Sequence, residues 1–501
     1  RSVHALALDV ARALHAHAPA AMTRSCRALA SPLSPLVVMV AALAAVAPCA
    51  AVAIDPSWGM IFGNVALTSD KVKVNAVAAF TCGVNQTCSY LGGSFNGVLT
   101  YALSTAQQQA QLDSGSGSMA TAWGNSLTAA STDQSAFVAR SRVLEGATNE
   151  LQVDWTVGLL AGSTGATATV HDVALAPDGG VYIVGEFTGR VDTKDATTAS
   201  AALASEGVGT SDGFFMKVNN KGFIRHILHL KGPKANAITS VQYGGNPGFK
   251  ERVVLAGYYG GVSATLTSIT SAASQTVASL NLSAVDMSHG IVMEIEMDVG
   301  ATGEVRGTPD LRWSLLVNGA VEDATNPAAT AVAASAIKGD TVLGGAYCTG
   351  TIFGTTGDYR LVTYFPGGGC DALGGGAYCF GAVTNLRGAR DVWVAKVGPA
   401  ISGNLTSVGL QVAWISAVGG NSSETPTSIV HDAAAGTVYV TGDTAGKAMY
   451  GGGSGSLKQL VAIDPLTLDA KAGFMVQLDA NNGIAAWGVH GSNAAPDTRY
   501  S

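Results

Sequence analysis

The stretch Asn421–Asp443, NSSETPTSIVHDAAAGTVYVTGD, contains the pattern that the rest of the chain repeats. A polar turn leads into a short apolar strand at Ser428–Val430, and a turn of small residues ends at Gly436. The next segment, Thr437–Thr441, is rich in β-branched and aromatic residues and stops at Gly442. Two such strands joined by a short turn of small residues predict an antiparallel hairpin.

Another pair of predicted strands precedes this hairpin. Asp391–Lys396 (DVWVAK) is a short companion strand, and Val412–Ile415 follows it after a loop. With the hairpin they make a unit of four short antiparallel strands. One such unit cannot bury both of its faces, whereas copies packed side by side can.

Both strand patterns recur along the chain. The Val-Tyr-Val-Thr-Gly pattern returns, with weaker matches, at Gly63–Thr68, Val181–Gly185, Val253–Gly257 and Val342–Gly345. The companion pattern returns at Phe137–Arg140, Phe215–Lys217, Val292–Glu294 and Met475–Gln477. A tryptophan or bulky apolar residue follows most copies, at Trp155, Leu230, Trp313, Trp414 and Trp487. A repeated unit of this kind predicts one continuous array with five detectable copies.

The combined pattern resembles the SBBP-type, bacterial-style β-propeller repeats of secreted and cell-surface proteins. The match is closest at 391–443, good at 170–218, degenerate at 233–345 and weakest at 54–140. The resemblance implies an all-β fold, a β-propeller of about 5 to 7 four-stranded antiparallel blades with long loops between strands. These motifs lie in core strands, so the resemblance implies a fold and transfers no catalytic residue.

The composition suits packed strands and tight turns. Only 13% of the 501 residues are charged, and 63 are glycine. Disorder would require a higher charge and fewer apolar residues. The formal net charge of -7, without a run of Lys or Arg, offers no surface for a phosphate backbone. We therefore expect no nucleic-acid partner.

The first 53 residues have the features of targeting sequence. In residues 22–53, two arginines precede the apolar segment Leu36–Ala47, and Ala51–Ala53 fits a signal-peptidase site. Residues 1–21 are either translated upstream sequence or part of a longer bipartite targeting peptide. The apolar segment is too short for a membrane span. We therefore expect residues 54–501 to be the repeat array of a secreted or cell-surface protein.

The C-terminal pattern predicts a last unit that needs completion. Trp487–Asn493 is similar to Trp414–Asn421, which precedes a Val-Tyr-Val-Thr-Gly hairpin, but the sequence stops at Ser501. Two alternatives remain open. Either the N-terminal strand completes the last blade, as in closed propellers, or further sequence or further copies complete the array.

Long insertions fall at one position of the unit, between the Gly-ending strand and the companion strand. They cover residues 192–210, 264–288, 349–390 and 451–472, and Gln107–Gly117 has the composition of a flexible loop. Insertions at one position of a repeat project from one face. We expect a protein or glycan partner to bind at this loop face.

Two groups of cysteines are candidates for disulfides in an oxidising compartment. Cys82 and Cys88 flank a tight loop, and a local bond between them is expected. Cys348, Cys370 and Cys379 surround a Gly-rich insertion, where we expect one pair to bond. Their spacing does not match a zinc site, so we predict no metal.

Four Asn-X-Ser/Thr sequons are candidates for N-glycosylation. They begin at Asn85, Asn281, Asn404 and Asn421, all in predicted loops. Glycosylation of a secreted chain would require a eukaryotic source.

The titratable residues have structural interpretations. His171-Asp172 and His431-Asp432 occupy the same position of two units, where repeated acid-base or metal chemistry is the alternative to a structural role. An Asp in a β-turn accepts backbone N–H bonds, and we interpret these Asp residues as turn formers. The same interpretation applies to Asp178, Asp212, Asp391 and Asp443.

Candidates for carbohydrate chemistry are sparse. Glycoside hydrolysis needs two carboxylates facing one pocket. The only candidates are Glu322 with Asp323 and Asp298 with Glu304. Exposed tryptophans could stack on sugars, but a repeated position predicts a core role for Trp155, Trp313, Trp414 and Trp487.

The sequence therefore predicts a non-enzymatic extracellular scaffold or adhesion module without cofactor, catalytic residue or membrane span. A carbohydrate-binding or carbohydrate-active propeller is the first alternative. Acidic and aromatic side chains at one channel mouth would favour it. A structural subunit of an extracellular filament is the second alternative.

Overall fold

The fold is all-β, and its strands form several antiparallel sheets. The computed structural model describes residues 60–63, 72–83, 86–103, 127–128, 133–144, 150–195, 199–206, 210–245, 250–261, 263–269, 274–281, 288–300, 304–319, 325–335, 345–353, 359–364, 379–382, 390–399, 410–420, 423–445, 448–452, 458–459, 461–462 and 472–492. The targeting segment 1–53 predicted from the sequence lies outside these residues.

Five sheets follow one another along the chain, and we number them 1 to 5. In spatial order, sheet 1 contains β2 (Val72–Gly83), β3 (Gln86–Asn96), β6 (Gln134–Leu144), β7 (Glu150–Ala161), β10 (Arg190–Lys194) and β11 (Ala199–Ala204). Sheet 2 contains β8 (Thr167–Leu175), β9 (Val181–Thr188), β12 (Ser211–Val218), β13 (Ile224–Lys231), β16 (Ser263–Ile269) and β17 (Ser274–Asn281). Sheet 3 contains β14 (Asn236–Gly245), β15 (Lys250–Gly260), β18 (Ser288–Val299), β19 (Val305–Gly319), β22 (Tyr359–Tyr364) and β23 (Cys379–Ala382).

The last two sheets follow the same plan. Sheet 4 contains β20 (Thr325–Ser335), β21 (Gly345–Phe353), β24 (Arg390–Pro399), β25 (Leu410–Gly420), β28 (Ala448–Gly452) and β29 (Lys458–Gln459). Sheet 5 contains β26 (Glu424–Asp432), β27 (Thr437–Thr444), β31 (Ala472–Asp479), β32 (Ala485–Ser492) and β30 (Val461–Ala462), and the short pairing of β30 with β32 is parallel.

Each sheet has four strands of its own, which we call its first to fourth strands. Sheets 1 to 4 each have two further strands at the outer edge, beyond the fourth strand. These two strands come from the insertion between the second and third strands of the next sheet. The hairpin β10–β11, for example, lies in the chain between the second and third strands of sheet 2, yet β10 pairs with β7 of sheet 1. The expectation that these insertions form loops on one face is therefore wrong for their described parts. Their backbone groups complete the exposed edge of the preceding sheet.

A further three-stranded sheet precedes sheet 1. It contains β1 (Met60–Gly63), β4 (Val98–Leu103) and β5 (Leu127–Thr128), with β4 between the other two. β4–β5 lies between the second and third strands of sheet 1, as the other outer hairpins lie in their units. β1 pairs antiparallel with β4, so it occupies the position of a fourth strand.

The hairpin at Asn421–Asp443 forms as predicted, with longer strands. β26 and β27 pair antiparallel, and Gly436 adopts a positive φ of 63° in the turn between them. The second strand of sheet 1 is β3, and that of sheet 4 is β21, which begins at Gly345. Apart from Gly63 and Gly345, the weaker matches at Gly63–Thr68 and Val342–Gly345 lie outside the described residues.

Apolar side chains fill the spaces between successive sheets. Val138 of sheet 1 and Met216 of sheet 2 belong to one buried cluster, and Phe215 of sheet 2 and Met293 of sheet 3 belong to the next. Two further clusters join sheets 3 and 4, and sheets 4 and 5. Because side chains alternate along a strand, the third strands of sheets 2, 3 and 4 each contribute to the clusters on both sides. We call the face toward the next sheet in the chain the front face, and the opposite face the rear face.

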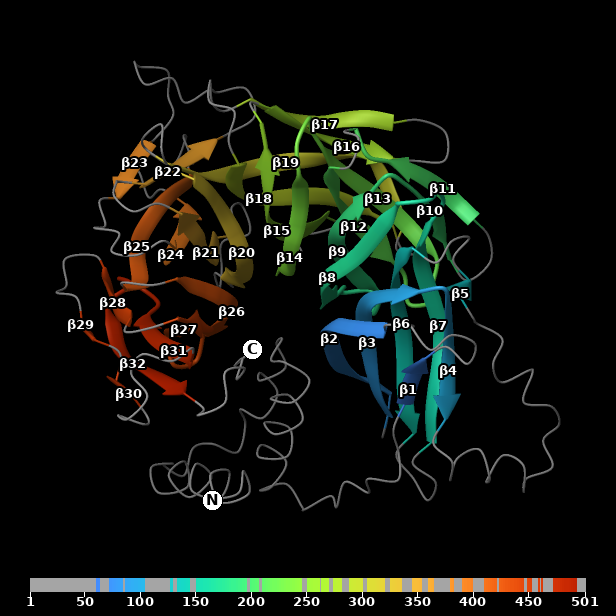
Figure 1. Ribbon diagram of the computed structural model, residues 1–501, viewed down its shortest axis with the longest axis horizontal. Coiled ribbons are helices and arrows are strands. Elements are labelled where there is room, and N and C mark those ends of the chain that lie inside the picture. The colour runs from blue at the N-terminus through green and yellow to red at the C-terminus, as the bar shows by residue number, and fades with distance from the viewer. Residues whose placement is uncertain are drawn as a thin grey trace.

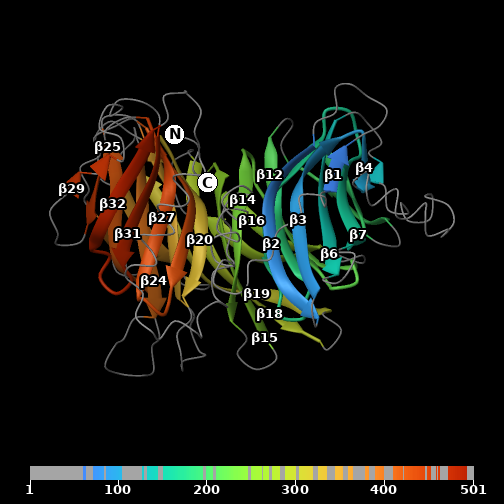
Figure 2. The ribbon, with the colours of Figure 1, turned by 90° about the horizontal axis from the view of Figure 1, so that it is seen from below.

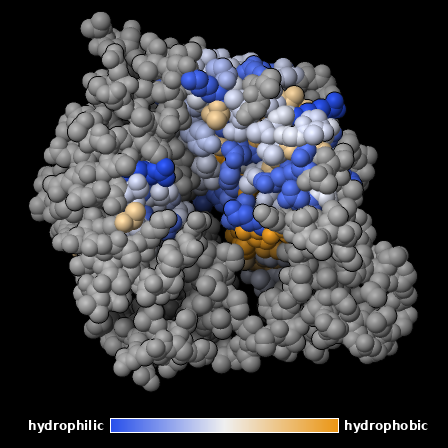
Figure 3. Space-filling view, viewed as in Figure 1, coloured by the Kyte–Doolittle hydropathy of each residue, from blue (hydrophilic) through white to orange (hydrophobic). Residues whose placement is uncertain are grey.

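The five sheets form an open arc around a central space, with their first strands innermost (Figure 1). The first strands follow in the order β2, β8, β14, β20 and β26. Among the described strands, β26 and β2 are the two ends of this arc and lie apart. Figure 2 shows the same separation from below, and we call it the opening in the arc. Figure 3 shows a mostly hydrophilic described surface around the central space, with an apolar area where β2 lies.

Candidate functional site

A row of three paired residues crosses the front face of every sheet. Its members lie opposite one another on the second, third and fourth strands, and we call each set a front row. The five front rows are Tyr90–Arg140–Trp155, Tyr182–Lys217–His226, Val254–Glu294–Trp313, Tyr347–Lys396–Trp414 and Tyr439–Gln477–Trp487. They combine aromatic rings with polar side chains, and in sheets 1 to 4 the next sheet covers this surface.

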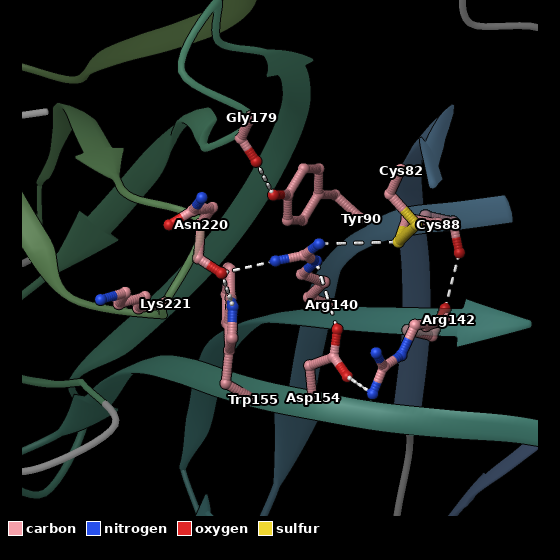
Figure 4. Close-up of polar contacts among 12 residues, drawn as sticks. Cys82, Cys88, Tyr90, Arg140, Arg142, Asp154, Trp155, Gly179, Asn220 and Lys221 are labelled. Carbon is pink, nitrogen blue, oxygen red and sulfur yellow. Dashed lines mark hydrogen bonds and ion pairs between the residues drawn. A yellow bond between two sulfur atoms is a disulfide. The ribbon is translucent and has the colours of Figure 1, made fainter. Parts of the chain in front are cut away.

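The front row of sheet 1 donates to backbone carbonyls of sheet 2 (Figure 4). The Trp155 indole N–H donates to the carbonyl oxygen of Asn220 over 3.0 Å, and an Arg140 guanidinium nitrogen lies 2.5 Å from the same oxygen. The Tyr90 hydroxyl donates to the carbonyl of Gly179. Burial raises the pKa of Tyr90, so the phenol keeps the proton that it donates.

The front row of sheet 4 converges on one atom of sheet 5. The carbonyl oxygen of Ala480 accepts bonds from the Tyr347 hydroxyl at 3.0 Å, the Lys396 ammonium at 3.1 Å and the Trp414 indole at 3.1 Å. Burial raises the pKa of Tyr347 to about 12 and lowers that of Lys396. Three donors on one carbonyl fix the position of sheet 5 against sheet 4.

Asn220 and Ala480 occupy equivalent turns between the third and fourth strands. Each turn is built by the preceding residue, because the side-chain oxygen of Asn219 or Asp479 accepts backbone N–H bonds from the turn. These bonds leave the next carbonyl pointing toward the preceding sheet, where it meets the tryptophan.

A glycine ends each of these turns under the indole ring. Gly222 has a φ of 82°, and a Cβ atom there would lie 2.7 Å from Cγ of Trp155. Gly483 has a φ of 68°, and its Cβ would lie 2.4 Å from Cε3 of Trp414. The turn therefore contacts the indole in two ways: its glycine packs against the ring face, and its carbonyl accepts the indole N–H.

Between sheets 2 and 3, a carboxylate replaces the turn carbonyl. The Lys217 ammonium lies 2.5 Å from a carboxylate oxygen of Glu251 and 3.5 Å from one of Asp178. The Tyr182 hydroxyl donates to the same oxygen of Glu251. The Lys217 side chain is fully buried, and these carboxylates are its ionic partners.

The front row of sheet 3 contains a buried acid. Glu294 lies 3.7 Å from the Arg252 guanidinium, which also pairs with Glu296 at 3.1 Å. Burial raises the pKa of Glu294 to about 7, although Arg252 opposes the shift. This carboxyl therefore titrates near neutral pH.

The front row of sheet 5 differs from the other four because it is exposed. Trp487 is 37% exposed, whereas Trp155, Trp313 and Trp414 are buried. Met475, beside the row on the third strand, is also 37% exposed, whereas its equivalents Val138, Phe215, Val292 and Val394 are buried. The sequence prediction of a core position is therefore wrong for Trp487. The same residue type lies at the same position, but among the described residues no following sheet covers it.

The exposed row keeps the geometry of the buried rows. The ring centroids of Tyr439 and Trp487 lie 6.3 Å apart, and the Gln477 amide donates to the Tyr439 hydroxyl over 3.0 Å. The hydroxyl hydrogen of Tyr439 and the indole N–H of Trp487 are donors like those that bind the next sheet elsewhere. This surface, made of Tyr439, Met475, Gln477 and Trp487, is the candidate site, and we call it the exposed front row.

The two His-Asp pairs are not equivalent. His431 pairs with Val438 at the position where Leu175 pairs with Val181 in sheet 2. His171 lies further back in β8, at a bulge, with Nε2 3.5 Å from Glu186. The prediction that the two dipeptides occupy the same position of the repeat is therefore wrong, because the segment between the dipeptide and the second strand has a different length in each unit.

The Asp residues divide into two groups. The carboxylates of Asp178 and Asp432 accept backbone N–H bonds in turns, as predicted. Asp172 instead lies within β8, where it accepts bonds from Ser240 and Val241 of sheet 3 at 2.9 Å each, and burial raises its pKa to about 6. Asp212 is also buried, in a contact of 2.8 Å with the His229 ring. For these two, the turn interpretation is wrong. Asp391 and Asp443 likewise lie within strands, in β24 and β27.

The cysteines and sequons are only partly described. Cys82 and Cys88 form a disulfide with an Sγ–Sγ distance of 2.02 Å at the β2–β3 hairpin. Cys348 was a disulfide candidate, but it is a free thiol buried between sheets 3 and 4. Asn281 is the last residue of β17 rather than part of a loop. Outside the described residues lie Cys370, Asn85, Asn404 and Asn421, and the side chain of Cys379 is also not described.

The carboxylate candidates do not assemble into a described pocket. Glu322 and Asp323 lie outside the described residues, and Glu304 pairs with Arg306 at 3.3 Å. In the described part of the chain, no three His, Cys, Asp or Glu side chains gather as metal ligands would. Nor do the residues that the structure describes include a helix long and apolar enough to span a membrane.

No protein-family model matches the chain, and no curated protein matches it significantly. The assignment of a function therefore depends on the exposed front row and its four buried counterparts.

The exposed front row was not found from the sequence, although a signal for it exists. The companion strands end in Arg140, Lys217, Glu294, Lys396 and Gln477, and a long polar residue at a position expected to be buried predicts a polar partner. The change to an uncharged Gln477 in the last copy marks the row that differs.

Proposed function

We propose that this protein is a non-enzymatic extracellular scaffold, a β-propeller of SBBP-like blades that binds a protein partner. The observation that supports the proposal is the 37% exposure of Met475 and Trp487. Their equivalents in the other four sheets are buried, and in sheet 2 the residue equivalent to Trp487 is the buried His226. Large apolar side chains exposed side by side mark interaction sites. The partner therefore binds at the front face of sheet 5 rather than at the insertion hairpins.

The remaining front rows support a structural role. In sheets 1, 2 and 4, polar groups of the front row bond to the next sheet, as in the bonds from Tyr347, Lys396 and Trp414 to Ala480. Polar groups that are hydrogen-bonded between sheets stabilise the scaffold. The Cys82–Cys88 disulfide supports an oxidising, extracellular location.

A glycan is the second candidate partner. Trp487 lies beside Tyr439 and the Gln477 amide, and exposed aromatic rings with a neighbouring amide can stack on and bind a sugar. A protein partner is favoured because the equivalent surfaces of sheets 1 and 4 bind polypeptide.

The test compares immobilised wild-type protein with two variants in medium from the native source. Met475→Ser/Trp487→Ser removes the exposed apolar side chains, and Leu175→Ser is a matched control, because Leu175 is 38% exposed elsewhere on the molecule. We expect a protein that wild type and Leu175→Ser retain and the double variant loses. Equal retention by all three, or release of reducing sugars from a polysaccharide, would contradict the proposal.

A further inference from the structure

The three-stranded sheet reproduces the outer half of a complete sheet. β7, β13, β19 and β25 are fourth strands, and each pairs antiparallel with an inserted hairpin strand, β10, β16, β22 or β28. β1 pairs with β4 in the same way. Among the described residues no strand pairs with the other edge of β1, where a third strand lies in every complete sheet.

The sequence around β1 agrees with this position. Trp58-Gly59-Met60 is similar to Trp487-Gly488-Val489 at the start of β32, which is a fourth strand. β1 is thus the fourth strand of a sheet whose first three strands are not among the described residues.

The opening in the arc lies on the rear side of sheet 1, where Leu99 of β4 and Leu127 of β5 pack with Phe137 of β6. Figures 1 and 2 show it between sheet 5 and β2, and the exposed front row lies on the face of sheet 5 that sheet 4 does not cover. Val77 of β2 is partly exposed and Ala79 is exposed, and Figure 3 shows an apolar area there. Both sides of the opening therefore offer apolar surface to an occupant.

We propose that a β unit of the same repeat fills this opening as a sixth sheet, supplying the first three strands while β1 supplies the fourth. Its rear face covers Met475 and Trp487, and its third strand pairs with the edge of β1 that no described strand occupies. This inference rests on the proposed function, because it names the partner of the exposed front row.

The chemistry of the occupant follows from the covered rows. Its third strand ends in Asn or Asp, the next carbonyl accepts the indole N–H of Trp487, and a glycine with positive φ lies against the ring. Residues 167–222, which contain Asn219, Asn220 and Gly222, already do this for Trp155. Residues 424–483 do the same for Trp414.

The test extends the full chain after Ser501 with a flexible linker and a second copy of residues 167–222. A second version carries residues 424–483, so the test does not depend on one extension folding. A matched control extension carries Gly222→Val, which blocks the contact with the indole because Gly222 has a φ of 82°. Hydrogen exchange is followed at β1 and at β31–β32. Acrylamide quenching of Trp487 is obtained by difference from Trp487→Phe.

We expect at least one extension to slow exchange of the β1 amides by about tenfold or more, and to shield Trp487, while the control does neither. Shielding of Trp487 without protection of β1 would overturn the sixth sheet and leave the proposed function standing. The sixth sheet would also be overturned if neither extension had an effect, or if the control extension protected β1 and Trp487 equally. The retention experiment with Met475→Ser/Trp487→Ser tests the proposed function separately, because it does not use the extensions.

Discussion

The indole nitrogen of Trp414 lies 3.1 Å from the carbonyl oxygen of Ala480 in the next sheet, and Trp155 and Asn220 repeat this contact at 3.0 Å. In both places the acceptor follows an Asn or Asp that builds the turn, and a glycine supports the ring. Trp487 presents the same group on the last sheet, but to solvent.

Truncation of the buried tryptophan should cost much more than truncation of the exposed one. Trp414→Ala removes a buried ring and a donor, and we expect the free energy of unfolding to fall by about 3–5 kcal/mol. Trp487→Ala should cost less than about 1 kcal/mol, because the ring is already hydrated in the isolated chain. Urea unfolding of both variants measures the difference, and similar losses would contradict an exposed Trp487.

Gly483→Ala should destabilise the contact between sheets 4 and 5. The new Cβ would lie 2.4 Å from Trp414 in a backbone with φ 68°, so the indole must move. Gly436→Ala is the matched control, with φ 63° and no atom within 4 Å of the added Cβ. We expect a loss of about 1 kcal/mol for the control, from backbone strain alone, and at least about 2 kcal/mol more for Gly483→Ala. Equal thermal shifts in the two variants would show that the glycine does not support the ring.

Glu294 should make stability depend on pH near neutrality. Burial raises its pKa from 4.5 to about 7, so between these values the folded protein keeps a proton that the unfolded chain has released. Stability should therefore fall as pH rises from about 4.5 to 7 and stay low above it.

The variant Glu294→Gln isolates this effect. It should remove this part of the slope and be more stable than wild type at pH 8, by on the order of 3 kcal/mol. The difference between the two unfolding curves is the quantity to measure, because Asp172, with a pKa raised by burial to about 6, contributes a slope of the same sign. Parallel curves across this range would contradict the assignment.

The buried ion pair between sheets 2 and 3 should be strongly coupled. Lys217→Met leaves the buried carboxylate of Glu251 without its cation, and we expect a loss of about 3–5 kcal/mol. Lys217→Met/Glu251→Gln should recover part of this loss, because the uncompensated charge is gone. Arg190→Met is the control, since Arg190 and Asp192 form an exposed pair that should contribute less than about 1 kcal/mol. A double variant no better than Lys217→Met would argue against the coupling.

The sequence predicts the repeat well and its connections poorly. The hairpin at Asn421–Asp443 and the companion strands are visible because β-branched and aromatic residues alternate in them. The outer hairpins such as β10–β11 are not, because they pair with the preceding sheet, and a pairing between units leaves no periodic signal within one unit. Small residues and differing lengths in the insertions hide them further.

The candidate site is hidden for a different reason. Repeated sequence positions predict repeated environments, and by that rule Trp487 belongs to the core like Trp414. Its environment depends on whether another sheet follows, which is a property of the whole array rather than of the local sequence. The same reason explains the error at Asp172, whose partners Ser240 and Val241 belong to the next sheet.

The most direct test of the exposed front row is hydroxyl-radical footprinting of Met475 and Trp487 in two samples, the purified chain and the protein isolated from its native source with its partners. Trp393, which is fully buried, and Leu175, which is exposed, serve as internal references. We predict that Met475 and Trp487 are oxidised readily in the purified chain and are protected in the native material, while both references stay unchanged. Equal oxidation in the two samples would contradict the claim that a partner covers this surface.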